Sequence, residues 1–442
     1  MFRSRSRLSF RFLAALLALA LVALTGCRRP PEEDAKRIQF AFWGSVQQQR
    51  AEEELIDRFH EAHPEIEVDV MVIGSRYAEV IQAMIIGGVA PDVFMVNLIN
   101  YDEWSSRGVL EDLTGKFLSV DEEAEVLPIP RRAVERDGRF FGIPINAHGM
   151  VTFYNRDALD AAGIELPPEG INWEFLEEMA PRLSRRAGRT DAPTDFLMLM
   201  PPPPILFWQH GVEFFDDLTH PTEVTVNVPE AIEAIGLLRR FRESGYSVPP
   251  DIASDEGTYQ LFRDGRVAFY FNGRWMTPEF AGRTDFDWDI RPFPGGPVSN
   301  ITQHGGTVLA IWKDSPRKEA ARKFLRFYAS ERGARISMQW QRNVPIFDEL
   351  AYGDDFLDLR PPESMVHFSD TMQEGASQYN LYAPGGQEVT RIFYNHIERA
   401  LADPDIPAEE ILAGMEYDLE RWLQRMQRRG IFESPAETPA GG

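Results

Sequence analysis

Strand patterns and helix patterns alternate regularly near the start of the folded region, and this order limits the fold more than any other feature of the chain. Arg37–Trp43, Ile66–Ile73 and Asp92–Asn97 are rich in branched and aromatic residues, which is typical of strands. Between them, Gln47–His60 and Tyr77–Ile86 carry apolar residues at helical spacing. This βαβαβ order predicts a parallel sheet flanked by helices. Such sheets bind ligands beyond the carboxyl ends of their strands, so we expect binding residues in the loops that follow the three strands.

The rest of the chain predicts a second set of strands and helices. Gly142–Asn155 predicts a strand pair, and Val267–Phe271 and Thr307–Trp312 predict two further strands. Helical patterns extend over Trp173–Leu183, Pro229–Ser244, Arg317–Tyr328 and Val389–Met426. The stretch Met198–Pro204 ends in four prolines and cannot be regular helix, so we expect it to deliver Phe207–Trp208 on a loop.

The first residues of the chain predict an export signal. Four arginines at positions 3, 5, 7 and 11 precede an uninterrupted apolar run, Phe12–Leu24. This run is shorter than the roughly 18 to 20 residues that a membrane-spanning helix needs, so residues 1–26 are predicted to be a signal peptide. Leu24-Thr25-Gly26-Cys27 resembles the bacterial lipobox, in which the cysteine sulfur receives diacylglycerol. We therefore expect a lipid anchor on Cys27, a tether over residues 27–36 and export to the periplasmic or extracellular face of the membrane. A chance cysteine after an unprocessed signal is the alternative.

Composition narrows the class of protein further. Cys27 is the only cysteine, so disulfides cannot stabilise the fold and a large apolar core must do so. About 400 residues remain after the signal, which is enough for two ordinary domains. The formal charge of -23 becomes -27 once the four signal arginines are removed. A surface this acidic repels phosphate groups, which argues against nucleic acid as a partner.

Four local patterns follow one another over about 240 residues. The first is Gly87-Gly88-Val-Ala-Pro91-Asp92-Val-Phe, and the second is Phe141-Gly142-Ile143-Pro144 with Phe153-Tyr154-Asn155-Arg156-Asp157 downstream. The third contains Asn272-Gly273-Arg274-Trp275, and the fourth is Gly305-Gly306-Thr-Val-Leu-Ala-Ile. Together they resemble the extracellular solute-binding proteins of the carbohydrate-uptake class, the group that includes maltose- and glycerol-phosphate-binding proteins.

The resemblance implies a two-lobed α/β clamp fold, in which each lobe is a central sheet flanked by helices and the chain crosses the hinge more than once. Residues 37–147 and 308–345 would form the first lobe, residues 148–307 and 346–432 the second, and residues 433–442 a disordered tail. The resemblance also implies the solute-binding subunit of an ABC importer, which holds a carbohydrate between its lobes and delivers it to the membrane permease. Such a subunit needs no cofactor, no metal and no catalytic residue, and we expect a monomer.

Sugars present hydroxyls at the ring edge and apolar C–H faces, so their sites combine polar groups with aromatic platforms. The ends of the first and third strands supply the candidates Trp43, Gly44, Ser45, Asn97 and Asn100. The resemblance adds candidates from later segments, namely His148, Trp208, Asn272, Trp275, Gly305, Gly306 and Arg342. Among them, Trp275 matches the stacking tryptophan of the family. Turn chemistry for the asparagines, hinge packing for His148 and a surface ion pair for Arg342 are the alternatives.

Other chemistries find little support in the sequence. His60-x-x-His63 lacks a third metal ligand nearby, no Gly-x-Ser-x-Gly elbow or phosphate-binding glycine loop is present, and Glu52–Glu54 is expected on a solvated helix face. A glycerol-phosphate-type solute would require a cationic clamp, for which Arg274, Arg342 and Arg391 are the candidates. A secreted carbohydrate-active hydrolase is the other alternative, because catalytic carboxylates are paired in space rather than in sequence.

Overall fold

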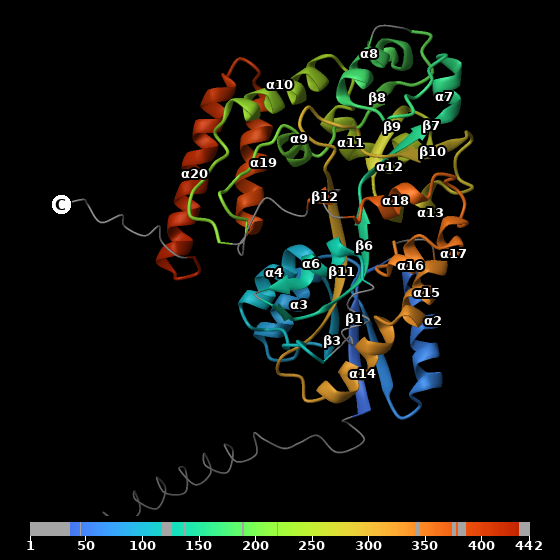
Figure 1. The fold of residues 1–442 in the computed structure, drawn as a ribbon, viewed down its shortest axis with the longest axis vertical. Coiled ribbons are helices and arrows are strands. Elements are labelled where there is room, and N and C mark those ends of the chain that lie inside the picture. Colours follow the sequence, from blue (N-terminus) through green and yellow to red (C-terminus); the bar gives the residue numbers. More distant parts are fainter. Residues whose placement is uncertain are drawn as a thin grey trace, which may run out of the picture.

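Two main β-sheets, one in each lobe, organise the chain (Figure 1). The computed structural model describes residues 36–44, 46–116, 126–136, 138–187, 190–218, 220–340, 344–373, 377–378 and 386–432. Within these residues the sheet of the first lobe has six strands and that of the second lobe has four, and helices flank both. The expected two-lobed α/β fold is confirmed.

The sheet of the first lobe begins as the sequence predicts. β1 (Arg37–Phe42) pairs in parallel with β2 (Glu67–Val72) and with β3 (Val93–Asn97). β11 (Thr302–Ile311) then pairs antiparallel with β3, and β6 (Ile143–Gly149) pairs antiparallel with β11. The parallel arrangement is therefore limited to the first three strands, because β11 enters the sheet from the second lobe and runs against β3.

Helices cover both faces of this sheet because neighbouring residues of a strand point to opposite sides. α2 (Val46–Ala62) and α14 (Lys318–Tyr328) pack on one face, where aromatic rings from both helices and from β1 meet edge to face. α3 (Tyr77–Ile86) and α4 (Leu98–Ser106) cover the other face. The α2, α3 and α14 segments lie within two residues of the helices predicted from apolar spacing.

The sheet of the second lobe joins strands from distant parts of the chain. β7 (Val151–Asn155) pairs antiparallel with β9 (Val267–Asn272) on one side and with β10 (Trp288–Arg291) on the other. β8 (Phe196–Met198) completes the sheet in parallel with β9. The predicted strands at residues 142–155 and 267–271 are thus confirmed. The first pair leads from one sheet to the other, and the strand at 267–271 lies inside the second sheet.

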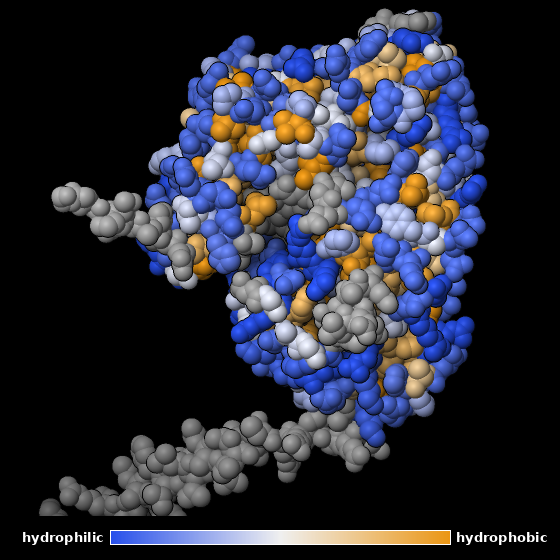
Figure 2. All heavy atoms as spheres, viewed as in Figure 1, coloured by the Kyte–Doolittle hydropathy of each residue, from blue (hydrophilic) through white to orange (hydrophobic). Residues whose placement is uncertain are grey.

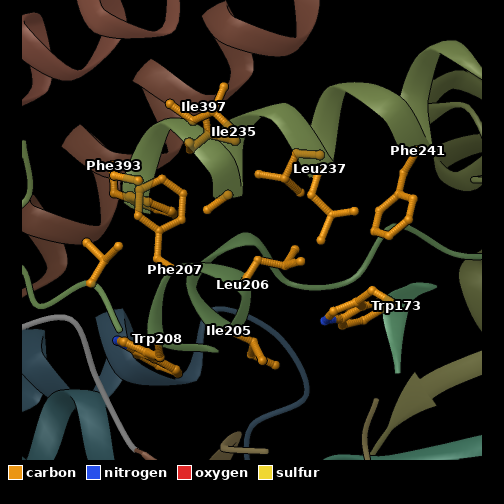
Figure 3. Close-up of a cluster of buried hydrophobic side chains, with 14 of the residues drawn as sticks. Trp173, Ile205, Leu206, Phe207, Trp208, Ile235, Leu237, Phe241, Phe393 and Ile397 are labelled. Carbon is orange, nitrogen blue, oxygen red and sulfur yellow. The ribbon is translucent and has the colours of Figure 1, made fainter. Parts of the chain in front are cut away.

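Helices from three segments complete the second lobe. α8 (Trp173–Leu183) and α10 (Pro229–Glu243) form where the sequence predicts them. The tail predicted as helical over Val389–Met426 is divided into α19 (Gly386–Ala402) and α20 (Ala408–Arg428), because two prolines stand between them and cannot donate backbone hydrogen bonds. Figure 3 shows apolar side chains of these helices meeting in one buried cluster.

The chain passes repeatedly between the lobes. β6 ends in the first sheet and β7 begins two residues later in the second. β10 and β11 make the return passage, and α15 (Glu331–Gln339) packs on α2 before the chain reaches Val344. A hydrophobic cluster that contains Leu127, Phe153 and Val344 joins these passages. The division of residues between the two lobes stays a prediction.

The other elements are short. They are α6 (Pro128–Val134), β4 (Glu135–Arg136), β5 (Arg139–Phe140), α7 (Arg156–Ala161), η2 (Arg185–Ala187), α9 (Pro203–Gln209), α11 (Pro250–Glu256), α12 (Thr258–Arg263), η3 (Arg274–Met276), α13 (Thr277–Phe280), α16 (Asp348–Ala351), α17 (Asp354–Leu357), α18 (Val366–Asp370) and β12 (Ser377–Gln378).

The visible outer surface of the molecule is mainly hydrophilic (Figure 2). Figure 2 shows hydrophilic side chains over most of the visible face, with apolar ones in small separate patches. Among the described residues, no helix combines the length and the apolar character needed to cross a bilayer. The predicted signal peptide, the anchor on Cys27 and the tail over residues 433–442 lie outside the described residues.

Candidate ligand-binding site

A cavity of about 340 Å³ opens at the carboxyl ends of β1 and β3, where the order of strands predicts ligand binding. Its lining comes from these strand ends and from the starts of α3 and α4, namely Trp43, Arg76, Tyr77, Ala78, Glu79, Met95, Val96, Asn97, Asn100 and Trp104. Three of the five residues predicted from strand ends, Trp43, Asn97 and Asn100, are thereby brought together. Gly44 follows Trp43 directly, and Ser45 lies outside the described residues.

An aromatic pair forms one wall of this cavity. The ring centroids of Trp43 and Tyr77 lie 5.0 Å apart at an interplanar angle of 77°, which is the edge-to-face arrangement that aromatic quadrupoles favour. The Tyr77 hydroxyl donates a 2.9 Å hydrogen bond to the backbone oxygen of Ala41. Burial raises the pKa of Tyr77 well above its usual value, so the phenol stays neutral. The wall is therefore uncharged and fixed in orientation.

The two asparagines of the cavity have different roles. Oδ1 of exposed Asn97 accepts a 2.9 Å hydrogen bond from the backbone N–H of Asn100, which caps α4 as the turn-chemistry alternative predicts. Asn100 is buried, and its Oδ1 accepts a 3.0 Å hydrogen bond from Nε2 of Gln387 at the start of α19. Because α19 packs on α10 and α20, this hydrogen bond joins α4 to that group of helices beside the cavity.

Two smaller cavities continue along this edge of the sheet. One, of about 40 Å³, shares Met95 with the large cavity and is lined in part by Glu52, Asn146 and Tyr328. The other, of about 10 Å³, shares Asn146 and includes Gly305–Gly306. Each smaller cavity therefore shares one residue with a neighbouring cavity, and the smallest borders β6 and β11.

The carboxylate of Glu52 is buried, so its assignment to a solvated helix face is wrong. Glu52 is 6% exposed, and its Oε2 accepts a 2.8 Å hydrogen bond from the hydroxyl of Tyr328 in α14. Burial, and secondly the charge of Glu52, raise the pKa of Tyr328 well above its usual value, so the phenol keeps the proton that it donates. The donor from α14 explains why this carboxylate can turn inward while exposed Glu53 cannot.

Asn146 is a second residue of the site that the sequence analysis missed. Its side chain is half-buried, and its Oδ1 accepts a 3.1 Å hydrogen bond from the backbone N–H of Thr307. It lines both smaller cavities. The available signal was its position in the predicted strand pair, two residues before His148 on the same side of the strand.

Gly305 and Gly306 lie inside β11, whereas the sequence analysis placed them before a strand that starts at Thr307. Gly305 faces His148 and Gly306 faces Ala147 across the ladder of β6 and β11. A Cβ atom on Gly306 would lie 2.8 Å from the backbone oxygen of Asn146, so glycine permits the close approach of the strands here. Of His148, the structure describes only the backbone.

In the second lobe, Asn272 and Trp275 lie on the turn that follows β9. Nδ2 of Asn272 donates a 2.5 Å hydrogen bond to the hydroxyl of Tyr270, and its Oδ1 accepts one of 2.9 Å from the backbone N–H of Gly273. Both ends of the amide are thus used within the turn. Trp275 is half-buried, and its ring lies against Gly273, where an added Cβ atom would come within 1.7 Å of the ring.

Trp208 lies in helix α9, and its predicted position on a loop is wrong. Of the four prolines that were expected to prevent helix, Pro201 and Pro202 precede α9, whereas Pro203 and Pro204 occupy its first turn, where the missing N–H groups have no helical partner in any case. Trp208 is only 4% exposed, and its indole N–H has no hydrogen-bond partner in the described structure. Figure 3 shows it at the margin of the cluster, away from Phe393 and Ile397.

The structure gives no support to the cationic clamp of the phosphate alternative. Arg274 is fully buried against aromatic rings, Arg391 is exposed on α19 beside Glu388, and Arg342 lies outside the described residues. Within the described chain, no group of three or more His, Cys, Asp or Glu side chains is placed to hold a metal ion.

The family model described as bacterial extracellular solute-binding protein matches residues 43–335, which is more than half of the chain. One similar protein is the arabinooligosaccharide-binding protein of Halalkalibacterium halodurans, which is 27% identical over 43% of this chain and 44% of its own length. The match thus spans less than half of that relative. The maltodextrin-binding protein MdxE of Bacillus subtilis is 22% identical over 75% of this chain and 78% of its own.

A solved structure shows the same fold over nearly the whole chain. The ABC substrate-binding protein Lmo0181 of Listeria monocytogenes, in complex with cycloalternan, superposes with a TM-score of 0.76. The superposition covers 90% of this chain and 99% of that one at 24% sequence identity. At this identity the likeness establishes the two-lobed fold.

Proposed function

The chain belongs to the bacterial extracellular solute-binding protein family, and from this premise we propose that it captures an oligosaccharide between its lobes and delivers it to an ABC permease. The names of its relatives support this class of solute, since they bind arabinooligosaccharide, maltodextrin and cycloalternan. Delivery would follow closure of the lobes. A solute that binds the closed form more tightly than the open form raises the fraction of protein that is closed.

The cavity at the carboxyl ends of β1 and β3 carries the proposal. It has an aromatic wall, Trp43 with Tyr77, and a polar side that includes Asn97 and Asn100. An uncharged ring face beside amide groups suits the C–H face and the hydroxyls of a sugar. The two smaller cavities nearby, of about 40 and 10 Å³, are too small for a sugar ring, so the proposal rests on the large cavity.

The second lobe would cover the sugar when the lobes close. The proposed ligand contacts there are Trp208 and Trp275 as aromatic surfaces, and Asn272 and His148 as polar neighbours. The N–H of Trp208, which has no described partner, is a candidate donor to a sugar hydroxyl. Gly305–Gly306 would let the ligand approach the backbone of the strands between the lobes. Ser45 and Arg342 stay candidates outside the described residues.

The location and the mode of action complete the proposal. Acylation of Cys27 would hold the protein at the membrane near its permease, with residues 27–36 as the tether. We propose that it acts as a monomer, without cofactor and without catalysis. Residues 37–147 and 308–345 would move against residues 148–307 and 346–432 during closure.

A thermal-shift screen of the protein from Arg28 onward tests the function. The panel contains maltodextrins, arabinooligosaccharides and glycerol phosphate, with a chromogenic glycoside as a test for hydrolysis. A true ligand at 100 times its dissociation constant stabilises the folded state by about 2.7 kcal/mol. Stabilisation by an oligosaccharide without turnover is the expected result. Cleavage of the glycoside, or stabilisation by glycerol phosphate alone, would overturn the proposal.

A further inference from the structure

A buried arginine without a charged partner lies beside one of the proposed sugar contacts. Arg274 opens η3 and is 0% exposed. Its guanidinium lies over the rings of Phe356 in α17 and Phe368 in α18, at 4.7 Å and 5.6 Å from their centroids. Nη1 is 3.3 Å from the sulfur of Met365, whereas Nε and Nη2 have no hydrogen-bond partner in the described structure.

This arrangement lowers the stability of the fold. A buried charge loses its hydration, and only an opposite charge or a full set of hydrogen bonds offsets that loss. No described carboxylate forms an ion pair with Arg274, and burial lowers its pKa to about 9. Cation–π contacts with two phenylalanines recover part of the loss. Stability of the core therefore does not explain an arginine at this position.

The neighbouring residue, Trp275, gives a better explanation for an arginine at position 274. Arg274 and Met276 point into the core, whereas Trp275 between them is only half-buried. The Trp275 ring lies so close to the backbone of Gly273 that a Cβ atom there would be 1.7 Å from Cζ3. The three-residue turn thus carries a partly exposed indole beside an arginine that packs on α17 and α18.

We propose that Arg274 is a positioning residue for Trp275: its guanidinium, held by Phe356 and Phe368, fixes η3 so that the indole forms a preoriented platform for a sugar ring. This inference rests on the proposed function, since a platform matters only if a saccharide binds beside Trp275. Preorientation strengthens binding because the ligand no longer has to order the side chain that it contacts.

The shape of the guanidinium is the reason for arginine rather than another long side chain. A planar, delocalised cation can stack on an aromatic ring and resist rotation, whereas the ammonium of lysine is a point charge on a flexible stem. A methionine would fill the same space without a charge, but its three rotatable bonds allow several packings. Arg274→Met is therefore expected to separate stability from positioning.

The test uses protein labelled with 5-fluorotryptophan, in which the fluorine resonance lost in Trp275→Phe identifies Trp275 among the 9 tryptophans. In Arg274→Met we expect a higher melting temperature, a shifted or broadened Trp275 resonance, and maltodextrin or arabinooligosaccharide affinity reduced by up to about tenfold, the contribution of one aromatic platform. Phe356→Leu removes one of the stacked rings without changing η3, and should affect the resonance and the affinity in the same direction.

Arg156→Met is the matched control, because Arg156 is another arginine of the second lobe but is paired with Asp289 at 2.5 Å. It should lower the melting temperature and leave the Trp275 resonance and the affinity unchanged. An unchanged resonance and affinity in both Arg274→Met and Phe356→Leu would overturn the positioning role. If the unmodified protein binds no oligosaccharide, the proposed function fails, whereas the resonance still shows whether Arg274 fixes Trp275.

Discussion

The two lobes supply their candidate ligand contacts in different ways. In the first lobe, Trp43 and Asn97 stand at the carboxyl ends of parallel strands and border an open cavity. In the second lobe, whose strands are mostly antiparallel, Trp208 lies on a helix and Trp275 on a turn, and both are largely packed against the lobe itself. Parallel strands gather their ends at one edge, whereas antiparallel strands distribute them over two.

This difference indicates a division of labour during binding. The first lobe offers a cavity that is already formed, so a sugar can bind there before the lobes close. We propose that the aromatic side chains of the second lobe, Trp208 and Trp275, contact the sugar when the lobes close. Four measurements test this difference between the lobes. They concern the stability of each lobe, the response to pH, the share of each lobe in the affinity and the contact between the lobes.

The largest expected effect comes from a buried carboxylate that each lobe contains. Asp92, 2% exposed, accepts hydrogen bonds of 2.6 Å from Ser315 and 2.9 Å from the backbone N–H of Gln39. Asp289, also 2% exposed, accepts 2.5 Å and 2.8 Å hydrogen bonds from Arg156 and Ser364. Asp92 also contacts Arg317 at 3.2 Å. Asn at either position removes the negative charge that the arginine and the hydrogen-bond donors contact, and should lower the free energy of unfolding by about 3 kcal/mol, measured by urea denaturation.

Both substitutions should shift a single unfolding transition, because the hydrophobic cluster around Phe153 and Val344 joins the lobes. Glu67→Gln, on an exposed side chain of β2, is the control and should leave the midpoint unchanged. Two separate transitions, of which Asp92→Asn moves only one, would show that the lobes unfold independently and contradict this expectation.

The sequence predicted the candidate site of the first lobe better than that of the second, because the ends of parallel strands gather at one edge of a sheet. Apolar periodicity located β1 to β3 and α3 within a residue or two, and the parallel order then placed Trp43 and Asn97 near each other. Contacts that arise only from tertiary packing could not be predicted from local patterns. Glu52 turns inward because Tyr328, far along the chain, donates to it, and Trp208 joins a helix because prolines are tolerated in a first turn.

Alkaline pH should affect the two lobes in opposite directions. Burial raises the pKa of Tyr101 in α4 to about 12, so the unfolded chain loses this proton from about pH 10 while the folded protein keeps it. The folded state therefore loses stability as pH rises, by about 2.3 kcal/mol at pH 12. Tyr101→Phe should remove that part of the decline, measured as the change in urea midpoint between pH 9 and pH 11.5.

Arg274, in the second lobe, should change the stability of the protein with pH in the opposite direction. Its pKa is lowered to about 9 by burial, so above this pH the folded protein releases a proton that the unfolded chain retains, and stability rises with pH. Arg274→Met should remove this gain and make the alkaline decline steeper than in the unmodified protein. Equal slopes in Arg274→Met and the unmodified protein would show that Arg274 keeps its charge in the core.

Affinity measurements compare the two aromatic surfaces directly. Trp43→Ala removes a ring from the preformed cavity, and Trp275→Ala removes one from the second lobe. Each should weaken an oligosaccharide ligand by about tenfold in isothermal titration calorimetry, the value of one stacked ring. Tyr417→Ala, at an aromatic residue of α20 that is 58% exposed, is the control and should have no effect. Loss of affinity only in Trp43→Ala would place the whole ligand in the first lobe.

The smallest effect is expected at the contact between the lobes. Gln387→Leu removes the 3.0 Å hydrogen bond from α19 to Asn100 while keeping the size of the side chain. If this hydrogen bond breaks when the lobes open, its loss should favour the open form and weaken ligand binding by about fivefold, which corresponds to roughly 1 kcal/mol for one hydrogen bond. Gln49→Leu, which removes an exposed hydrogen bond to Glu53 within α2, is the control. Small-angle scattering without ligand should show a larger radius of gyration in Gln387→Leu alone. A variant that opens in this way yet binds with unchanged affinity would mean that the cavity of the first lobe holds the sugar without closure. The second lobe would then contribute nothing to the affinity.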